Sequence, residues 1–291
     1  MTRIGFVGLG SMGLPMARVL AAKGFAVTGF DLRAAAMQEL AAAGGKAADS
    51  VGDALAGADV AILMVVNAAQ AESVLFDSNA IARLAPGAVV MVMATCPPAK
   101  AQALAARVKA AGFGFVDAPV SGGVVGATAG SLTIMVGADD ADFARAKDAL
   151  EAMGSKVARV GDRPGAGSTA KAINQLLCGV HLAAAGEAMA LARKLGVDVS
   201  QILDVVSGSA ASSWMLRDRG PRMLEDHPRV TSAVDIFVKD LGIVLETGAG
   251  CGAQTPLAAA AHERFKQASA AGLGAEDDSQ VTRAFGDLKG R

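Results

Sequence analysis

A glycine-rich turn near the N-terminus places the tightest constraint on how this chain can fold. Gly8, Gly10 and Gly13 form a G-x-G-x-x-G pattern between a short apolar run, 3–8, and an amphipathic run, 11–23. That context predicts a strand, a tight turn and a helix. The first glycine then permits the turn, the second lets the backbone approach a pyrophosphate, and the third lets the helix pack on the strand. A turn without a ligand is the alternative. The predicted dinucleotide loop consists of Gly8, Leu9, Gly10, Ser11, Met12 and Gly13.

An acidic residue, Asp31, closes the second predicted strand, 26–31, and lies 18 residues after Gly13. A carboxylate at this position can accept both ribose hydroxyls of NAD, and it repels the 2′-phosphate of NADP. Arg33 could instead accommodate that phosphate, and Asp31 could simply cap the next helix. The pattern favours NAD as the cofactor.

Short apolar runs alternate with amphipathic runs of helical length through the first half, which predicts βαβ units and a mostly parallel sheet. After the turn cluster at 161–165 the sequence shows helical periodicity only, beginning with a long run to Lys194. We therefore predict a Rossmann-type α/β domain, 1–163, and an all-α substrate and dimerisation domain, 164–291, joined by a long interdomain helix. The polar end, 286–291, is expected to be frayed.

The composition argues against several classes of protein. Lys and Arg number 27 and Asp and Glu 28, so the chain has no basic footprint for nucleic acid or an anionic membrane. The three cysteines and three histidines are scattered without zinc or disulfide spacing, so we expect no metal site and a reducing compartment. The apolar run 173–192 contains His181 and Glu187, which favours a buried helix over a membrane span. The chain is expected to be cytoplasmic.

A second glycine-rich turn, 117–123, follows a short predicted strand. Consecutive small residues can expose backbone N–H groups as an anion nest, which suits a substrate carboxylate. Ser121 would add a hydroxyl donor beside Gly122 and Gly123. An ordinary loop is the alternative.

A lysine stands near the start of the long predicted helix. Lys171, Asn174 and Gln175 have i, i+3 and i+4 spacing and share one helix face. Beside NAD⁺, desolvation and the nicotinamide charge would lower the pKa of the lysine, which could then take a hydroxyl proton. Asn174 or Gln175 could orient the substrate, whereas a surface lysine is the alternative. Lys239 and Asp240 form a charge pair in another apolar helix. The pair could lie on a solvated helix face, or Lys239 could supply a cation that reaches the cofactor.

Four motifs occur in this order: the glycine loop 8–13, the turn 117–123, the helix start 165–175, and the pair Lys239 and Asp240. Together they resemble the β-hydroxyacid dehydrogenase family over residues 4–285. The resemblance implies that Lys171 is the catalytic acid/base and that residues 121–123 bind the substrate carboxylate. It also implies that four further residues lie along the cofactor: Met64, Val65, Thr95 and Lys239. Many members have Asn where this chain has Gln175, and Asn174 falls one residue earlier, so the substrate-orienting residue is less well defined.

Within the family, four segments are most similar to members that oxidise L-threonate at C2 to 2-dehydro-L-erythronate: 65–70, 179–185, 213–215 and 232–242. In that comparison Trp214 and Arg217 either shape the pocket or pack in the core or a dimer. The alternatives are a tartronate or succinic semialdehyde reductase, a 3-hydroxyisobutyrate dehydrogenase, and a noncatalytic dinucleotide-binding protein. Lys171 argues against the last. The resemblance also implies a homodimer or homotetramer.

Overall fold

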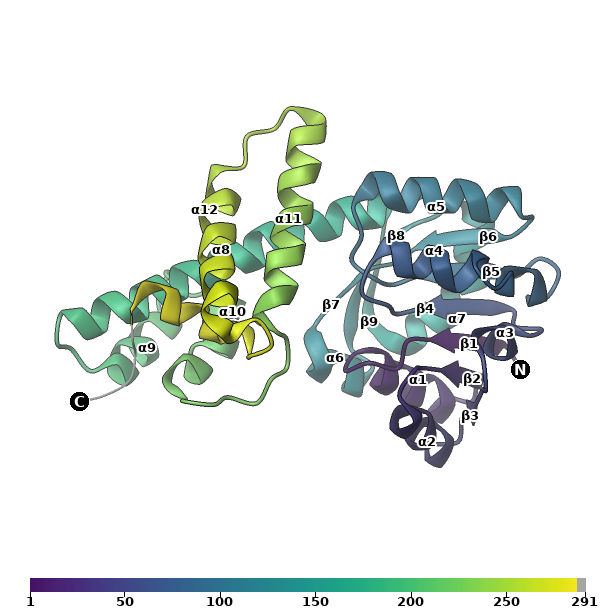
Figure 1. Ribbon diagram of the computed structural model, residues 1–291, viewed down its shortest axis with the longest axis horizontal. Helices are drawn as coiled ribbons and strands as arrows, with labels where there is room; N and C mark the ends of the chain where they lie inside the picture. The colour runs from purple at the N-terminus through teal and green to yellow at the C-terminus, as the bar shows by residue number, and fades with distance from the viewer. Residues whose placement is uncertain (287–291) are drawn as a thin grey trace. The chain divides into compact units, whose positions relative to one another are not determined.

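The computed structural model describes residues 1–286, and the chain divides into two compact units. Unit 1 is Met1–Lys171 and unit 2 is Ala172–Arg291 (Figure 1). The division falls inside one long helix, so each unit is described separately. Of the polar end that the sequence predicts to be frayed, 286–291, residues 287–291 lie outside the described residues.

Unit 1 is built on a nine-stranded sheet in the described residues, with the order β3-β2-β1-β4-β5-β6-β8-β7 and with β9 beside β8. Strands β1 to β6 pair in parallel, and β8 runs antiparallel to β6 and β7. Because β2 and β4 lie on opposite sides of β1, the sheet has a topological switch point at the carboxyl end of β1, where open α/β sheets bind ligands. The strands are β1 (Arg3–Val7), β2 (Ala26–Phe30), β3 (Lys46–Ala47), β4 (Val60–Leu63), β5 (Val89–Val92), β6 (Gly114–Asp117), β7 (Val120–Ser121), β8 (Leu132–Gly137) and β9 (Gly154–Gly161).

Helices cover both faces of this sheet because successive strand side chains point to opposite faces. Phe6 belongs to one apolar cluster with Met16 of α1, whereas its neighbour Val7 belongs to another with Leu75 of α4. Both faces are therefore buried, as the near-continuous apolar strands predict. The first cluster draws on α1 (Gly13–Ala22), α2 (Ala34–Ala42), α6 (Gly123–Ala129) and α7 (Asp140–Met153), and the second on α3 (Val51–Leu55), α4 (Ala68–Phe76), 3-10 helix η1 (Ala80–Arg83) and α5 (Pro98–Ala110) (Figure 1).

Among the described residues, unit 2 is built from helices joined by turns and loops, with an isolated bridge between Ala233 and Asp277. Its core contains a stacked pair, Phe237 and Phe265, with ring centroids 4.9 Å apart. The α/β and all-α architecture predicted from the sequence is thus confirmed. The elements are α8 (Ala166–Lys194, whose first residues belong to unit 1), α9 (Val199–Ser207), α10 (Trp214–Arg219), η2 (Pro221–Leu224), α11 (Val234–Cys251), α12 (Pro256–Ala268), π-helix η3 (Ser269–Leu273) and η4 (Asp278–Phe285).

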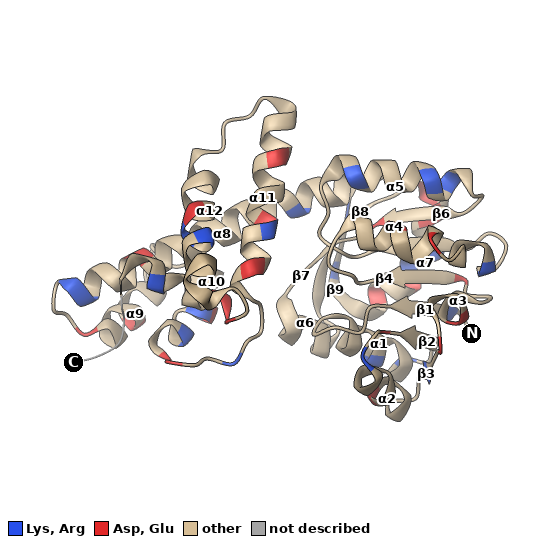
Figure 2. Cartoon of the chain, viewed as in Figure 1, with Lys and Arg blue, Asp and Glu red and all other residues tan. Residues whose placement is uncertain are grey.

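Helix α8 is long and apolar enough to span a membrane, but half of its most apolar stretch is buried inside the protein. The helix for which the sequence favours a buried position is thus only partly buried. Figure 2 shows basic and acidic residues mixed on the helices of both units.

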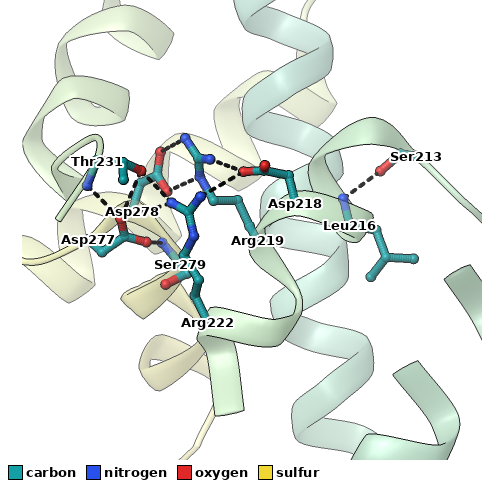
Figure 3. A network of polar contacts seen from close by, with 9 residues as sticks. All are labelled: Ser213, Leu216, Asp218, Arg219, Arg222, Thr231, Asp277, Asp278 and Ser279. Atoms are coloured by element: carbon teal, nitrogen blue, oxygen red, sulfur yellow. Dashed lines mark hydrogen bonds and ion pairs between the residues drawn. The ribbon is translucent and has the colours of Figure 1, made fainter. Parts of the chain in front are cut away.

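A buried ionic network ties α10 and η2 to the C-terminal helix η4 (Figure 3). The Arg219 guanidinium donates to Asp278, with 2.7 Å between Nε and Oδ1, and also to Asp218. Arg222 contacts Asp218 and Asp277, at 3.1 and 3.3 Å. Both Asp277 and Asp278 are fully buried, so the two arginines supply the charge that compensates them.

Candidate cofactor and substrate sites

The glycine loop between β1 and α1 has the geometry of a pyrophosphate cradle. Gly8 has φ +95°, and a Cβ there would lie 2.4 Å from the Met64 carbonyl oxygen. A Cβ on Gly13 would lie 1.9 Å from the Gly8 carbonyl oxygen, so helix and loop touch without a side chain between them. Gly10 has no atom within 4 Å of such a Cβ, which leaves its side of the loop open. The N-cap residue Met12 makes no side-chain hydrogen bond, so no side chain occupies the first amides of α1; the Leu14 N–H donates to the Gly10 carbonyl at 3.0 Å.

Asp31 fastens this loop to the end of β2. Its Oδ2 accepts the Leu9 N–H at 2.7 Å, and its Oδ1 accepts the Arg33 N–H and Nε at 2.9 and 3.1 Å. Burial acts to raise the pKa of Asp31, but the hydrogen bonds from Arg33 and Leu9 outweigh it and hold the pKa below its ordinary value. Asp31 is therefore a carboxylate at neutral pH, as an acceptor for ribose hydroxyls must be.

Arg33 pairs with Asp31 rather than standing free for a 2′-phosphate, and the Leu9 side chain does not face the open side of the loop. The Arg33 guanidinium folds back onto Asp31 and also donates to the Leu9 carbonyl at 2.6 Å. The Leu9 side chain is fully buried in the core. Leu9 therefore shapes the loop through its backbone, and the open surface of the loop belongs to Gly10, Ser11 and Met12.

The other predicted cofactor residues of unit 1 follow neighbouring parallel strands. Met64 and Val65 come directly after β4, and Thr95 comes shortly after β5. Since β1, β4 and β5 are adjacent and parallel, all three residues lie at the same carboxyl edge as the glycine loop.

Two exposed apolar residues at this edge were missed by sequence reasoning. Leu32 follows β2 and is 93% exposed, and Val66 follows β4 and is 53% exposed. Exposed aliphatic side chains on both sides of β1 suit a flat aromatic group such as adenine. Both residues lie in turns, where hydrophobic periodicity gives no signal. Only their position directly after a predicted strand could have identified them as candidate cofactor contacts. Together with the open cradle and the ionised Asp31, they fit a dinucleotide.

The second glycine turn of unit 1 is not a plain loop. Ser121 ends β7 and pairs with Thr133 of β8, so its position is set by the sheet. Gly122 and Gly123 have φ of +126° and +60°, which favour glycine, and α6 begins at Gly123. Successive amides in such a turn can converge on an anion.

Lys171 lies in the second turn of α8 and is only 7% exposed, so it is not an ordinary surface lysine. On the same helix, Asn174 Nδ2 donates to Gln175 Oε1 at 2.8 Å. Gln175 Nε2 in turn donates to Asp240 Oδ2 at 2.6 Å, and Lys239 Nζ lies 2.9 Å from Asp240 Oδ1. Unit 2 thus brings four of the singled-out residues, from α8 and α11, into one chain of contacts.

Trp214 and Arg217 lie on α10 of unit 2. Trp214 is 53% exposed, and its ring lies under the Arg219 guanidinium at 5.9 Å. Arg217 donates to the Ser212 hydroxyl at 2.7 Å. Trp214 is thus not a buried core residue.

The loop, the acidic residue after β2 and the switch point define a dinucleotide-dependent dehydrogenase with a helical second unit. Residues 3–161 match the family described as the NAD binding domain of 6-phosphogluconate dehydrogenase. Residues 165–285 match the NAD-binding family of NADP-dependent 3-hydroxyisobutyrate dehydrogenase. The chain belongs to the NAD-dependent β-hydroxyacid dehydrogenase family, of the 3-hydroxyisobutyrate dehydrogenase type, which confirms the resemblance predicted from its motifs and NAD as the cofactor.

Relatives align along almost the whole chain. It is 47% identical to an L-threonate dehydrogenase of Cupriavidus necator, over 97% of this chain and 95% of the relative. It is 34% identical to an NAD-dependent L-serine dehydrogenase of Pseudomonas aeruginosa, over the full length of both. Among solved structures, a 3-hydroxyisobutyrate dehydrogenase from Salmonella typhimurium is 44% identical with a TM-score of 0.92, covering 98% of this chain and 100% of that one.

Proposed function

We propose that this dehydrogenase oxidises the C2 hydroxyl of L-threonate to 2-dehydro-L-erythronate. The observation that carries the proposal is the identity of 40–47%, over 97–98% of the chain, to five proteins named L-threonate dehydrogenase. A 3-hydroxyisobutyrate dehydrogenase is the second candidate, favoured by the 44% identity to the Salmonella structure of that name. Tartronate semialdehyde reduction is a further alternative from the sequence.

Each motif singled out in the sequence takes one role in the proposed reaction. The Ser121 hydroxyl and the amides of Gly122 and Gly123 hold the substrate carboxylate, while Asp31 holds the cofactor ribose. Lys171 Nζ takes the proton of the C2 hydroxyl, and proton transfer of this kind is worth roughly 10²–10⁴-fold in rate. Bound NAD supplies the hydride acceptor. Positioning of the substrate by the nest contributes the larger share.

Gln175 and Asn174 take different roles in this proposal. The Gln175 amide is used at both ends, by Asp240 and by Asn174, and it is buried. Asn174 is less buried and adjoins it on the helix. We therefore assign the substrate contact to Asn174 and the task of holding Asn174 in place to Gln175, with Lys239 as the cofactor contact of α11.

We further propose that the protein is a cytoplasmic homodimer or homotetramer without nucleic-acid or membrane partners. Three large apolar side chains on α8, Ile173, Leu177 and Leu191, are 49–61% exposed. Their spacing of four and fourteen residues puts them on one face of the helix, where a second subunit could cover them. Sedimentation equilibrium gives the mass, and a monomer would refute the assembly.

The test measures NAD reduction with L-threonate, D-threonate, D-glycerate and 3-hydroxyisobutyrate. L-Threonate should give the highest kcat/KM, and a preference for another acid would refute the proposed substrate. Lys171→Ala should lower kcat at least about 10²-fold with NADH binding intact. Lys194→Ala, at the exposed far end of α8, is the matched control. If Lys171→Ala keeps its turnover, the lysine is not the acid/base.

A further inference from the structure

A carboxylate that the roles above leave unused holds the start of α8. Asp117, the last residue of β6, accepts the N–H groups of Gly165 and Ser168 on Oδ2, at 2.9 and 2.8 Å. Its Oδ1 accepts the Ser168 hydroxyl at 2.7 Å. Both side chains are 1% exposed, so these contacts are sealed from water. The first amides of a helix need acceptors, and here the acceptor comes from a residue 48 to 51 positions earlier.

The backbone at the start of α8 also lies directly against the sheet. A Cβ on Gly167 would lie 2.4 Å from the Met135 carbonyl oxygen and 2.6 Å from that of Asp117. A Cβ on Gly137 of β8 would lie 2.8 Å from the Gly167 nitrogen. Apart from the small Ala166 methyl group, which lies against Gly137 and Gly161, backbone packs on backbone here. The hydrogen bonds to the Asp117 carboxylate are the side-chain contacts that hold the turn in this position.

Asp117 contacts the chain on the way to both parts of the proposed site: the carboxylate nest at 121–123 and the proton acceptor Lys171. Four residues after it along the chain stands Ser121, the start of the carboxylate nest. One helical turn after Ser168 stands Lys171, the proposed proton acceptor. Strand β6 leads into the nest, and its terminal side chain holds the first turn of α8, one turn before the lysine. Asp117 thus links the position of the nest to that of the lysine.

We infer that Asp117 is a positioning residue for the oxidation: it fixes the first turn of α8, and through that turn Lys171, relative to residues 121–123. The inference rests on the proposed function, because it matters only if the lysine and the nest act on the same substrate. It assigns Asp117 no contact with substrate or cofactor. A cap that merely stabilises the fold is the competing explanation, and the two predict different kinetics.

The test compares Asp117→Asn with a matched control, a buried carboxylate of α7 that also accepts a hydrogen bond from β6. The amide keeps the shape of the carboxylate but replaces one acceptor oxygen with a donor. A displacement of about 1 Å can lower a rate about 10²-fold, so kcat per NADH-binding site should fall on that order, with a smaller change in KM. The primary deuterium isotope effect with C2-deuterated substrate should rise as hydride transfer becomes limiting. Asp142→Asn is the control, because Asp142 is equally enclosed and accepts the Phe115 N–H of β6 at 2.9 Å. It should leave kcat and the isotope effect unchanged.

A second pair of variants covers the case in which Asp117→Asn does not fold. Ser168→Ala removes the hydroxyl contact alone and should lower kcat several-fold with a raised isotope effect, and Ser168→Thr should restore both. If these variants lower the melting temperature but keep the wild-type kcat and isotope effect, Asp117 is only a structural cap and the inference is wrong. All measurements use whichever hydroxy acid the wild type oxidises. Failure of the inference therefore stays separate from failure of the proposed substrate or of Lys171.

Discussion

Asp278 should give unit 2 a pH dependence of stability that is opposite in sign to that of an ordinary ion-paired carboxylate. Burial raises the pKa of Asp278 from 3.8 to about 6; the Arg219 charge and its hydrogen bonds work against that rise, and the Asp277 charge adds to it. The folded protein therefore binds a proton at Asp278 more tightly than the unfolded chain does. Its contribution to stability is present in full below pH 3.8 and is lost as the pH rises through about 6.

The size of the effect follows from the two pKa values. Each pKa unit corresponds to about 1.4 kcal/mol. As the pH falls from 7.5 to 5, Asp278 takes up its proton in the native state while the same group in the unfolded chain stays ionised, so the free energy of unfolding should rise by roughly 1 kcal/mol. Asp277 does not offset this. Burial acts to raise its pKa too, but hydrogen bonds from Thr231 and Ser279 and the Arg219 charge hold that pKa below its ordinary value. Its contribution is lost only at lower pH.

The assay is urea unfolding followed by the fluorescence of Trp214, the only tryptophan, which lies beside Arg219 in unit 2. Asp278→Asn cannot ionise and should lose the rise of roughly 1 kcal/mol between pH 7.5 and 5. Its absolute stability should also fall, because Arg219 keeps only part of its compensation. Asp204→Asn, an exposed carboxylate of the same unit, should keep the wild-type dependence. An Asp278→Asn curve parallel to that of the wild type would refute the reasoning.

Two further substitutions test the assigned binding roles. Asp31→Ser removes the ribose acceptor and frees Arg33, so KM for NAD should rise at least about tenfold while KM for NADP falls; an unchanged NAD preference in steady-state kinetics would contradict the role of Asp31. Gln175→Met removes both contacts of the buried amide, so KM for the hydroxy acid should rise about tenfold while NADH affinity changes little. The exposed Gln201→Met is its control, and an unchanged KM would show that Asn174 does not depend on Gln175.

The sequence predicts the elements whose signal is local. The strands predicted over 3–8 and 26–31 are observed as Arg3–Val7 and Ala26–Phe30, one residue shorter at the end. Strand β9 was missed, because Gly154–Gly161 alternates poorly and lies at the edge of the sheet beside β8. Helix α10 ends at Arg219, and η2 begins at Pro221 after Gly220, where a proline favours the start of a new helix.

In the candidate sites too, local features could be predicted from the sequence and long-range contacts could not. Glycine spacing locates both turns, since a positive φ or a close backbone contact leaves a mark in the sequence itself. The partners of those turns leave none. Asp117 meets Ser168 across 51 residues, and Gln175 meets Asp240 across 65, and no periodicity in a single sequence relates positions that far apart. The sequence therefore locates each motif, whereas the side chains that hold each motif in place are identified only in the folded structure.

Gln175 and Asn174 together present an oriented amide on α8. The Gln175 side chain is one methylene longer than that of asparagine, and that length lets it reach the buried Asp240 on α11. Once its nitrogen is used by Asp240 and its oxygen by Asn174, it has little left to offer a substrate. Asn174, about 100° further round the helix, is then the amide whose carbonyl is held at a defined orientation. Asp240 also anchors Lys239, so the same buried carboxylate sets the direction of both an amide and an ammonium group. Substrate preference in this protein should therefore respond to changes at Asp240 as strongly as to changes at Asn174.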